Sequence, residues 1–261
     1  MHKAKILTLD IETAPLQSYH WGLFDQNISL DMVKVDWTIL SFSAKWLGEK
    51  KVIFKCTGGR GVKKVRDDKP LMGELWKLLD EADIVVAQNG KQFDIKKINT
   101  RLVFHGFAPY SPIQIVDTML VAKGKFGFTS NKLAFLSEQL TDTVKSKHKK
   151  FPGFELWEQC LADNKEAWDE MQAYNSQDVV ATEELYLKMR PWIDKHPNVA
   201  AYSTNEIPEC PRCGSHHIRK DGIRTSTSGK FQRYRCNDCG GVCQGKENLM
   251  PKLKRKVLLA T

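Results

Sequence analysis

The chain has 261 residues, of which 41% are hydrophobic, and it carries a formal net charge of +9. This composition supplies enough apolar side chains for a folded core and excludes an intrinsically disordered chain. No apolar run in the sequence approaches the roughly 20 residues that cross a bilayer, and Asp10 interrupts the first apolar segment too early for a signal peptide. We therefore expect an intracellular, cytoplasmic protein in a reducing environment, without a membrane partner.

The positive charge is concentrated in the C-terminal fifth of the sequence. Residues 205–261 contain 12 Lys and Arg against 5 Asp and Glu, a net charge of +7, whereas residues 1–204 carry +2. Such a basic segment attracts the phosphate backbone of nucleic acid, but a solvated basic face without a partner is equally common. Charge alone leaves both interpretations open.

In chain order, the first part of the sequence predicts a sheet. Short runs rich in β-branched residues predict strands at 4–9, 37–46 and 50–56, which would form a meander. A helix is predicted over 70–82, with Pro70 at its start, and an apolar run after it predicts a buried strand at 83–88.

The second part of the sequence is mainly helical. Further elements are predicted as a helix at 92–105, a strand at 113–117, and helices at 131–140, 154–162 and 165–189. The lysine-rich stretch 143–150 is expected to be a surface loop. This order of strands and helices predicts a mixed α/β sheet with helices on both faces.

Acidic residues stand where these elements would bring them together. Asp10 and Glu12 lie two residues apart at the end of the first strand, so both point to the same face of the sheet. Asp94 follows the fourth predicted strand, where open sheets place their ligand crevice. On the last helix, Tyr174 and Asp178 are one turn apart and share a face.

Carboxylates gathered in a core raise one another's pKa values, so such a cluster is stable only when cations are present. Hard oxygen ligands select Mg²⁺ or Mn²⁺. Two such ions can hold a phosphodiester, activate a water and stabilise the leaving oxygen. The chemistry expected of the cluster is therefore phosphodiester hydrolysis.

The chain resembles the DEDD-type 3′→5′ exonucleases, DnaQ-like enzymes on the ribonuclease H-like fold that include polymerase proofreading domains, in the motifs Asp10-Ile-Glu12, Asn89…Phe93-Asp94 and Tyr174-x-x-x-Asp178. The resemblance covers about residues 4–190. It implies that the four carboxylates bind two Mg²⁺ or Mn²⁺ ions, with Asp10 bridging them. It also implies that Tyr174 orients the attacking water.

One position distinguishes the two subclasses of this family. The histidine subclass has His five residues before the last Asp, and this chain has Ala173 there. The tyrosine subclass, DEDDy, has Tyr four residues before that Asp, which is Tyr174. The chain therefore resembles the tyrosine subclass, and because tyrosine with its usual pKa near 10 is a poor base at neutral pH, we expect Tyr174 to position the water.

Other residues of this region have two interpretations each. Asp117 either lies next to the metal ligands or caps the following helix, and capping is favoured. Asn89 either contacts the nucleic-acid strand or closes a turn. Tyr19, Trp21 and Phe24 either stack on terminal bases or belong to the core.

Two Cys-x-x-Cys pairs follow near the C-terminus, Cys210 with Cys213 and Cys236 with Cys239. This spacing is typical of two knuckles that present four thiolates to one Zn²⁺. Because all four positions would be filled, the zinc is expected to be structural. The stretch resembles the zinc ribbons at the N-termini of some bacterial transposases, which bind DNA, although here it stands at the opposite end of the chain.

We therefore expect an exonuclease domain over 1–195, a linker over 196–208, a zinc ribbon over 209–245, and a basic tail over 246–261, in which residues 252–256 are expected to be disordered. Alternating residues between the cysteine pairs predict a hairpin. The basic residues of this hairpin either contact nucleic acid, which is favoured, or lie on the surface of a module with a purely structural role. They are Arg219, Lys220, Arg224, Lys230, Arg233 and Arg235.

The sequence thus predicts a metal-dependent 3′→5′ exonuclease that acts on DNA, or on RNA, with a zinc ribbon that assists binding. The expected partners are nucleic acid, with single-stranded 3′ ends of DNA favoured, and replication or repair proteins. The alternatives are a catalytically weak protein that binds nucleic acid or docks partners, and an endonuclease on the same fold. The complete set of carboxylates argues against the pure binding protein.

Overall fold

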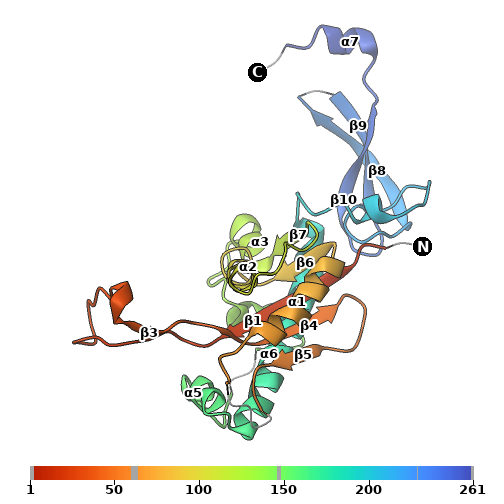
Figure 1. The fold of residues 1–261 in the computed structure, drawn as a ribbon. Helices are drawn as coiled ribbons and strands as arrows, with labels where there is room; N and C mark the ends of the chain where they lie inside the picture. The colour runs from red at the N-terminus through yellow and green to blue at the C-terminus, as the bar shows by residue number, and fades with distance from the viewer. Residues whose placement is uncertain (1–2, 60–63, 146–147, 228, 260–261) are drawn as a thin grey trace. The chain divides into compact units, whose positions relative to one another are not determined.

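The computed structural model describes residues 3–59, 64–145, 148–227 and 229–259. The chain divides into two compact units, one formed by Lys5–Tyr186 and the other by Met1–Ala4 with Leu187–Thr261. The larger unit contains a five-stranded sheet with its helices, and the smaller one contains a three-stranded sheet (Figure 1).

The larger unit is built on a five-stranded sheet with the order β5-β4-β1-β6-β7. Its strands are β1 (Ile6–Thr13), β4 (Ile39–Trp46), β5 (Ile53–Cys56), β6 (Ile84–Ala87) and β7 (Gln114–Asp117). β1, β4 and β5 form the predicted antiparallel meander, whereas β6 runs parallel to β1 and β7 runs parallel to β6. The mixed sheet confirms the predicted fold class.

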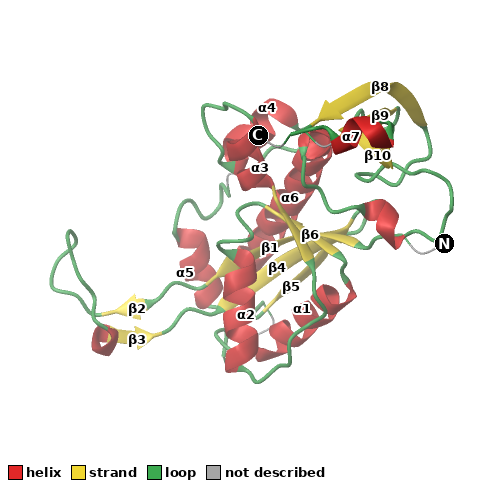
Figure 2. Ribbon diagram, turned by 90° about the horizontal axis from the view of Figure 1, so that it is seen from above, coloured by secondary structure: helices red, strands yellow, loops and turns green. Residues whose placement is uncertain are grey.

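Helices pack against both faces of this sheet (Figure 2). On one face, Leu7, Leu9 and Ile11 of β1 join the buried apolar side chains of the helices α1 (Lys69–Glu81) and α2 (Asp94–Phe104). A second apolar cluster joins Ala14 and Leu40 to the helices α5 (Glu155–Leu161) and α6 (Lys165–Met189). The remaining helices of this unit are α3 (Thr118–Lys125) and α4 (Leu133–Leu140).

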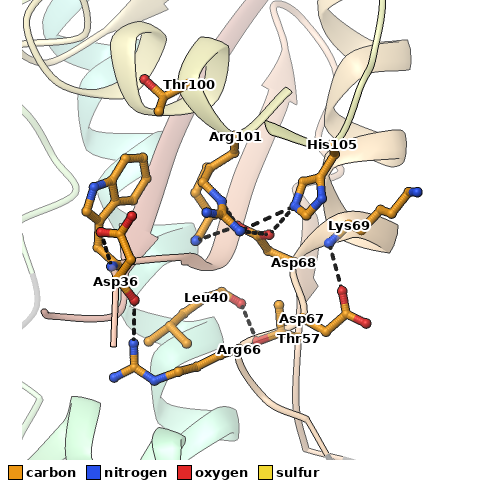
Figure 3. A network of polar contacts seen from close by, with 12 residues as sticks. Asp36, Leu40, Thr57, Arg66, Asp67, Asp68, Lys69, Thr100, Arg101 and His105 are labelled. Atoms are coloured by element: carbon orange, nitrogen blue, oxygen red, sulfur yellow. Dashed lines mark hydrogen bonds and ion pairs between the residues drawn. The ribbon is translucent and has the colours of Figure 1, made fainter. Parts of the chain in front are cut away.

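A buried carboxylate fixes α2, which carries Asp94, against α1 and β4 (Figure 3). Asp68 accepts two hydrogen bonds from the guanidinium of Arg101, both at 2.7 Å, and lies 2.6 Å from Nε2 of His105. It also accepts the Ile39 N–H at 2.9 Å. Burial alone would raise the pKa of Asp68, but the hydrogen bonds from Arg101, Ile39 and His105 lower it overall.

The strands β2 (Gln17–Ser18) and β3 (Val33–Val35) form an arm that extends away from the sheet (Figures 1 and 2). Tyr19, Trp21 and Phe24 lie on it with exposed fractions of 71%, 97% and 83%. These three side chains therefore do not belong to the core, and the core-packing interpretation is wrong. No pattern in the sequence of this segment predicts the arm itself.

The smaller unit contains a three-stranded antiparallel sheet with the order β10-β9-β8. The strands are β8 (Ile218–Ser226), β9 (Gly229–Cys236) and β10 (Val242–Asn248). β8 and β9 form the predicted hairpin, and β10 is a third strand that the sequence analysis missed. Residues 252–256 of the basic tail were expected to be disordered, but they form the short exposed helix α7 (Lys252–Lys256).

The segment expected as a linker contacts the cysteine module. It contains a 3₁₀ helix at Val199–Tyr202, and the Val199 N–H donates to the carbonyl of Pro211 at 2.9 Å. Nearby, Nε of Arg212 donates to the carbonyl of Ile193 at 3.1 Å. Across the described ranges, none of the helices combines the length and the apolar character needed to cross a bilayer.

Candidate active site and zinc centre

Asp10 and Glu12 project from β1 on the face that α6 covers. Leu7, Leu9 and Ile11 enter the core under α1 and α2, so the alternate residues of the strand point the other way. Across the antiparallel pair, Asp10 lies opposite Ser43 of β4 and Glu12 lies opposite Ser41. The carboxylates therefore lie over the middle of the sheet, between the strands and α6.

Three carboxylates meet at this place. Single oxygen atoms of Asp10, Glu12 and Asp178 all lie within 4.8 Å of one another. Asn175, one turn before Asp178 on α6, donates from Nδ2 to Oδ2 of Asp10 at 2.6 Å and accepts a bond from Oγ of Ser41 at 3.4 Å. Asn175 thus fixes α6 against β1 and orients Asp10, a role that the sequence analysis missed.

Asp94 stands beside these three carboxylates, at the first residue of α2. It is 2% exposed, and its Oδ1 accepts the N–H of Ile11 at 3.1 Å, between the two acidic residues of β1. The group within 4.8 Å, as found among the residues that the structure describes, has three members and does not include Asp94. The structure therefore brings Asp94 to the same strand, next to the other carboxylates.

The electrostatics of this cluster favour cations. Burial, with the charges of Asp94, Glu12 and Asp178, raises the pKa of Asp10 well above its ordinary value. Burial likewise raises the pKa of Glu12 to about 8 and that of Asp94 to about 7. Oδ1 of Asp178 is buried and has no hydrogen-bond partner in the described part of the chain.

A desolvated set of carboxylates with an unpaired buried oxygen fits divalent cations, because cations remove the repulsion that raises these pKa values. Hard carboxylate oxygens suit Mg²⁺ and Mn²⁺. The donor set is therefore compatible with the metal ions that the sequence analysis predicted.

Lys145 lies inside the acidic cluster, although its stretch was expected to be a surface loop. Its ammonium pairs with Oδ2 of Asp178 and lies 4.6 Å from the centre of the Tyr174 ring. Burial alone would lower the pKa of Lys145, but the charges of Asp178 and Tyr174 raise it overall. Lys145 is one of four lysines in TVKSKHKK, and the sequence contains no signal that separates it from the other three.

Tyr174 packs in an aromatic group beside the carboxylates. The rings of His148 and Trp157 meet it edge-on, with ring centres 5.2 Å and 6.1 Å away. Burial, together with the charges of Glu12 and Asp178, raises the pKa of Tyr174 to about 12. The phenol therefore stays protonated at neutral pH, so it can donate a hydrogen bond and cannot act as a base.

Asp117 is a helix cap, as the sequence analysis favoured. Its Oδ1 accepts the N–H groups of Met119 and Leu120, both at 3.1 Å, at the start of α3. The same carboxylate accepts the N–H groups of Asn89 and Lys91, also at 3.1 Å, and so holds the turn after β6. Asn89 has a φ of 64°, a left-handed conformation that Asn tolerates, which supports its turn role.

The four cysteines of the smaller unit form a second cluster. Their sulfur atoms all lie within 4.8 Å of one another, and the Sγ atoms of Cys210 and Cys239, like those of Cys213 and Cys236, are 3.6 Å apart. A tetrahedral zinc with Zn–S bonds of about 2.3 Å would separate its sulfurs by about 3.8 Å. The hydrogen bond between Cys210 and Cys213 lowers the pKa of Cys210 to about 5 and raises that of Cys213, so the pair readily carries one thiolate, and the fit to a metal rests on the sulfur distances. The set fits one zinc ion.

Glycines close the two turns that carry these cysteines. Gly214 and Gly240 have φ values of 74° and 75°, where a Cβ atom would be strained. Their N–H groups donate to the carbonyls of Cys210 and Cys236 at 2.8 Å and 3.0 Å. The turns thereby point both cysteines of each pair inward.

The basic residues predicted to contact nucleic acid lie on two adjacent strands. β8 carries Arg219, Lys220 and Arg224, and β9 carries Lys230, Arg233 and Arg235.

Comparison with known proteins agrees with this fold. The sequence profile of the RNase H superfamily matches residues 50–190, more than half of the 261-residue chain, and the chain belongs to this superfamily. The matched region includes Asp94, Tyr174 and Asp178, whereas Asp10 and Glu12 precede it. No curated protein shows a significant sequence match.

Among solved structures, the chain is similar to the family B DNA polymerase from the hyperthermophilic archaeon Pyrobaculum calidifontis, with 16% sequence identity and a TM-score of 0.49. The similarity covers 72% of this chain and 25% of the polymerase, so the chain spans about a quarter of the polymerase's length.

Proposed function

We propose that this protein is a metal-dependent 3′→5′ exonuclease that hydrolyses phosphodiester bonds of DNA, or of RNA. The observation that supports this proposal best is the meeting of Asp10, Glu12 and Asp178 within 4.8 Å, with Asp94 next to them. The membership in the RNase H superfamily, whose members process nucleic acid, supports the same substrate class.

Asp10, Glu12, Asp94 and Asp178 would hold two Mg²⁺ or Mn²⁺ ions. Bound divalent ions of this kind activate water for attack and stabilise the leaving oxygen of a phosphodiester. Asn175 keeps Asp10 in a fixed orientation through its hydrogen bond of 2.6 Å.

Tyr174 would position the attacking water by donating a hydrogen bond, in keeping with its raised pKa of about 12. Lys145 holds Asp178 through the ion pair and contacts the Tyr174 ring, so it supports both residues. The ammonium also adds a positive charge where a phosphodiester would bind, which favours an anionic substrate.

The cysteine module would bind one structural Zn²⁺ and hold nucleic acid through its basic strands. Its covalent connection to the larger unit would raise the local concentration of substrate. Tyr19, Trp21 and Phe24 on the exposed arm are available to stack on unpaired bases, which supports a preference for single-stranded ends.

The test is an incubation of the purified protein with Mn²⁺ and a 5′-labelled single-stranded oligonucleotide. A ladder of products shortened from the 3′ end is expected, and a blocked 3′ end should prevent it. Asp10→Ala and Asp178→Ala should abolish cleavage and keep binding. Internal cuts would favour the endonuclease alternative, and wild-type binding without any cleavage would favour the binding protein.

A further inference from the structure

The strand register divides the six basic residues of β8 and β9 between two faces of their sheet. Arg233 and Arg235 are two residues apart on β9 and therefore share a face. On β8, Arg219 lies opposite Arg235 and Arg224 lies opposite Phe231, so these residues project on that same face. We call the set of Arg219, Arg224, Phe231, Arg233 and Arg235 the arginine face.

The two lysines, Lys220 and Lys230, project from the opposite face of the sheet, which we call the lysine face. Lys220 lies opposite Tyr234, which alternates with Arg233 and Arg235 along β9. Lys230 lies an even number of residues from Tyr234 and shares its face. The six basic residues were predicted from the sequence as one set of nucleic-acid contacts, but the register separates the four arginines from the two lysines.

Among the residues that the structure describes, the arginine face holds four guanidinium groups, and its ion pairs involve a single carboxylate, that of Asp221. Arg219 and Arg235 are directly opposite each other, and like charges in this position destabilise a sheet. Asp221 offsets part of this repulsion, because its carboxylate pairs with Arg235 at 3.2 Å and with Arg233 at 3.4 Å. One carboxylate cannot neutralise four guanidinium groups, so a bound anion would relieve the remaining repulsion.

The chemistry of this face selects phosphate. Guanidinium groups present planar pairs of donors that match the oxygens of a phosphate. Arg233 and Arg235 are already oriented by Asp221, while Arg219 and Arg224 are exposed to solvent. Phe231 stands among these arginines and offers a ring on which an unpaired base can stack.

We infer that the arginine face binds the phosphate backbone of single-stranded nucleic acid, with Phe231 against a base, and that the lysine face makes no direct contact. This inference rests on the proposed function, since nucleic acid is its substrate. It extends that function by assigning binding to one side of the ribbon sheet.

The test compares two pairs of substitutions that remove the same charge from opposite faces, Arg219→Gln with Arg224→Gln, and Lys220→Gln with Lys230→Gln. All four side chains are exposed, so neither pair should disturb the fold. Both are made in the full-length Asp10→Asn protein, which prevents cleavage during the measurement. Zinc content and melting temperature check that the module stays intact.

Affinity for a labelled single-stranded oligothymidylate is measured by fluorescence anisotropy over a series of salt concentrations. The arginine pair should weaken binding about tenfold or more, and the slope of log K against log salt should fall by about 1.4, because two phosphate contacts are lost. The lysine pair should weaken binding about twofold or less, through long-range charge only. Phe231→Ala should weaken binding to the single strand more than binding to a duplex of the same length.

Equal effects of the two pairs would overturn the assignment of a face, as would a larger effect of the lysine pair. If the arginine pair abolished binding of a poly-glutamate peptide and left oligonucleotide affinity unchanged, the face would belong to an acidic protein partner instead. These outcomes are independent of the exonuclease proposal. A protein that cleaves from the 3′ end but responds equally to both pairs would refute only this inference, and a protein that shows the face difference but never cleaves would refute only the exonuclease.

Discussion

The ammonium of Lys145 pairs with the carboxylate of Asp178, so a cation supplied by the chain itself lies within the acidic cluster. The Lys145 side chain is 26% exposed and that of Asp178 is 3% exposed, and the pair is therefore shielded from solvent. Lys145 should stabilise the protein most when no other cation balances the carboxylates.

Replacing Lys145 with Met tests this role. Without divalent cations, Lys145→Met should lower the free energy of unfolding by about 3 kcal/mol, because Asp178 is left as an uncompensated buried charge. With saturating Mg²⁺ the loss should be clearly smaller. Urea unfolding under both conditions measures it, and Lys149→Met, an exposed change in the same stretch, is the control. An equal loss with and without Mg²⁺ would contradict the interpretation.

The raised carboxyl pKa values predict how stability changes with pH. The pKa values of Glu12 and Asp94 are about 8 and about 7 in the folded protein, above their ordinary values of 4.5 and 3.8. The folded state therefore binds more protons than the unfolded state in this range. The contribution of these groups to stability is present at low pH and is lost as the pH rises through about 7 to 8.

We accordingly expect the protein without divalent cations to become less stable from about pH 6 to about pH 8, and Glu12→Gln to reduce this dependence. Mg²⁺ should raise the melting temperature more at the upper end of this range, because protons no longer compete for the carboxylates. Melting curves of both proteins over the range, with and without Mg²⁺, give the comparison. A Glu12→Gln protein whose stability falls with pH as steeply as that of the wild-type protein would rule out the raised pKa of Glu12.

Asp68 should be a stability residue without a part in the chemistry. Asp68→Asn removes the charge that Arg101 and His105 face and should cost about 3 kcal/mol in the free energy of unfolding. The neighbouring exposed change Asp67→Asn should cost less than about 0.5 kcal/mol. Far below its melting temperature, the Asp68→Asn protein should keep its cleavage rate; a lost rate in a fully folded sample would place Asp68 in the site.

The arm should contribute to binding without contributing to stability. Trp21 is 97% exposed, so Trp21→Ala should change the free energy of unfolding by less than about 0.5 kcal/mol. If it stacks on a base, the same change should weaken binding of a single-stranded 3′ end by about 1 to 3 kcal/mol. Lys34→Ala removes a positive charge from the same arm and measures how much of the affinity depends on charge. Unchanged affinity together with unchanged stability would exclude the stacking role.

The cysteine cluster should hold one zinc per chain. Cys239→Ser should release the zinc and unfold the ribbon sheet, because a module of this size depends on its metal for folding. Cys243→Ser is the matched control, since Cys243 lies on β10 outside the four-cysteine group. Zinc content and circular dichroism measure both, and zinc retained at full occupancy in the Cys239→Ser protein would refute the four-thiolate site.

The residues that the sequence located correctly follow regular periods. Asp10 and Glu12 could be assigned to one face because a strand repeats every two residues, and Tyr174 and Asp178 because a helix repeats every 3.6. Asp94 followed from an uninterrupted apolar run in front of it, which marks a buried strand. In each case the local pattern determines the direction of the side chain.

Lys145 and Trp21 could not be located in this way. Lys145 lies in a lysine-rich loop, where the path of the backbone is set by distant contacts rather than by a repeat. Trp21 is a large apolar residue of a type that is usually well buried, and its exposure depends on the arm that carries it away from the sheet. β10 was missed because VCQGKEN shows neither clear alternation nor a continuous apolar run.

The place of β1 in the sheet has a consequence for how the molecule opens. β1 pairs with β4 from Leu7 to Thr13, but its described pairs with β6 end at Thr8, before Asp10 and Glu12. The backbone amides of a strand paired on both edges exchange with deuterium only in rare, extensive openings. We therefore expect the slowest amide exchange at Leu7 and Thr8, which are paired with both neighbouring strands, and faster exchange around Asp10 and Glu12, where β1 pairs with β4 and the Ile11 N–H donates to the Asp94 carboxylate. The acidic end of β1 can thus open locally while the centre of the sheet stays paired.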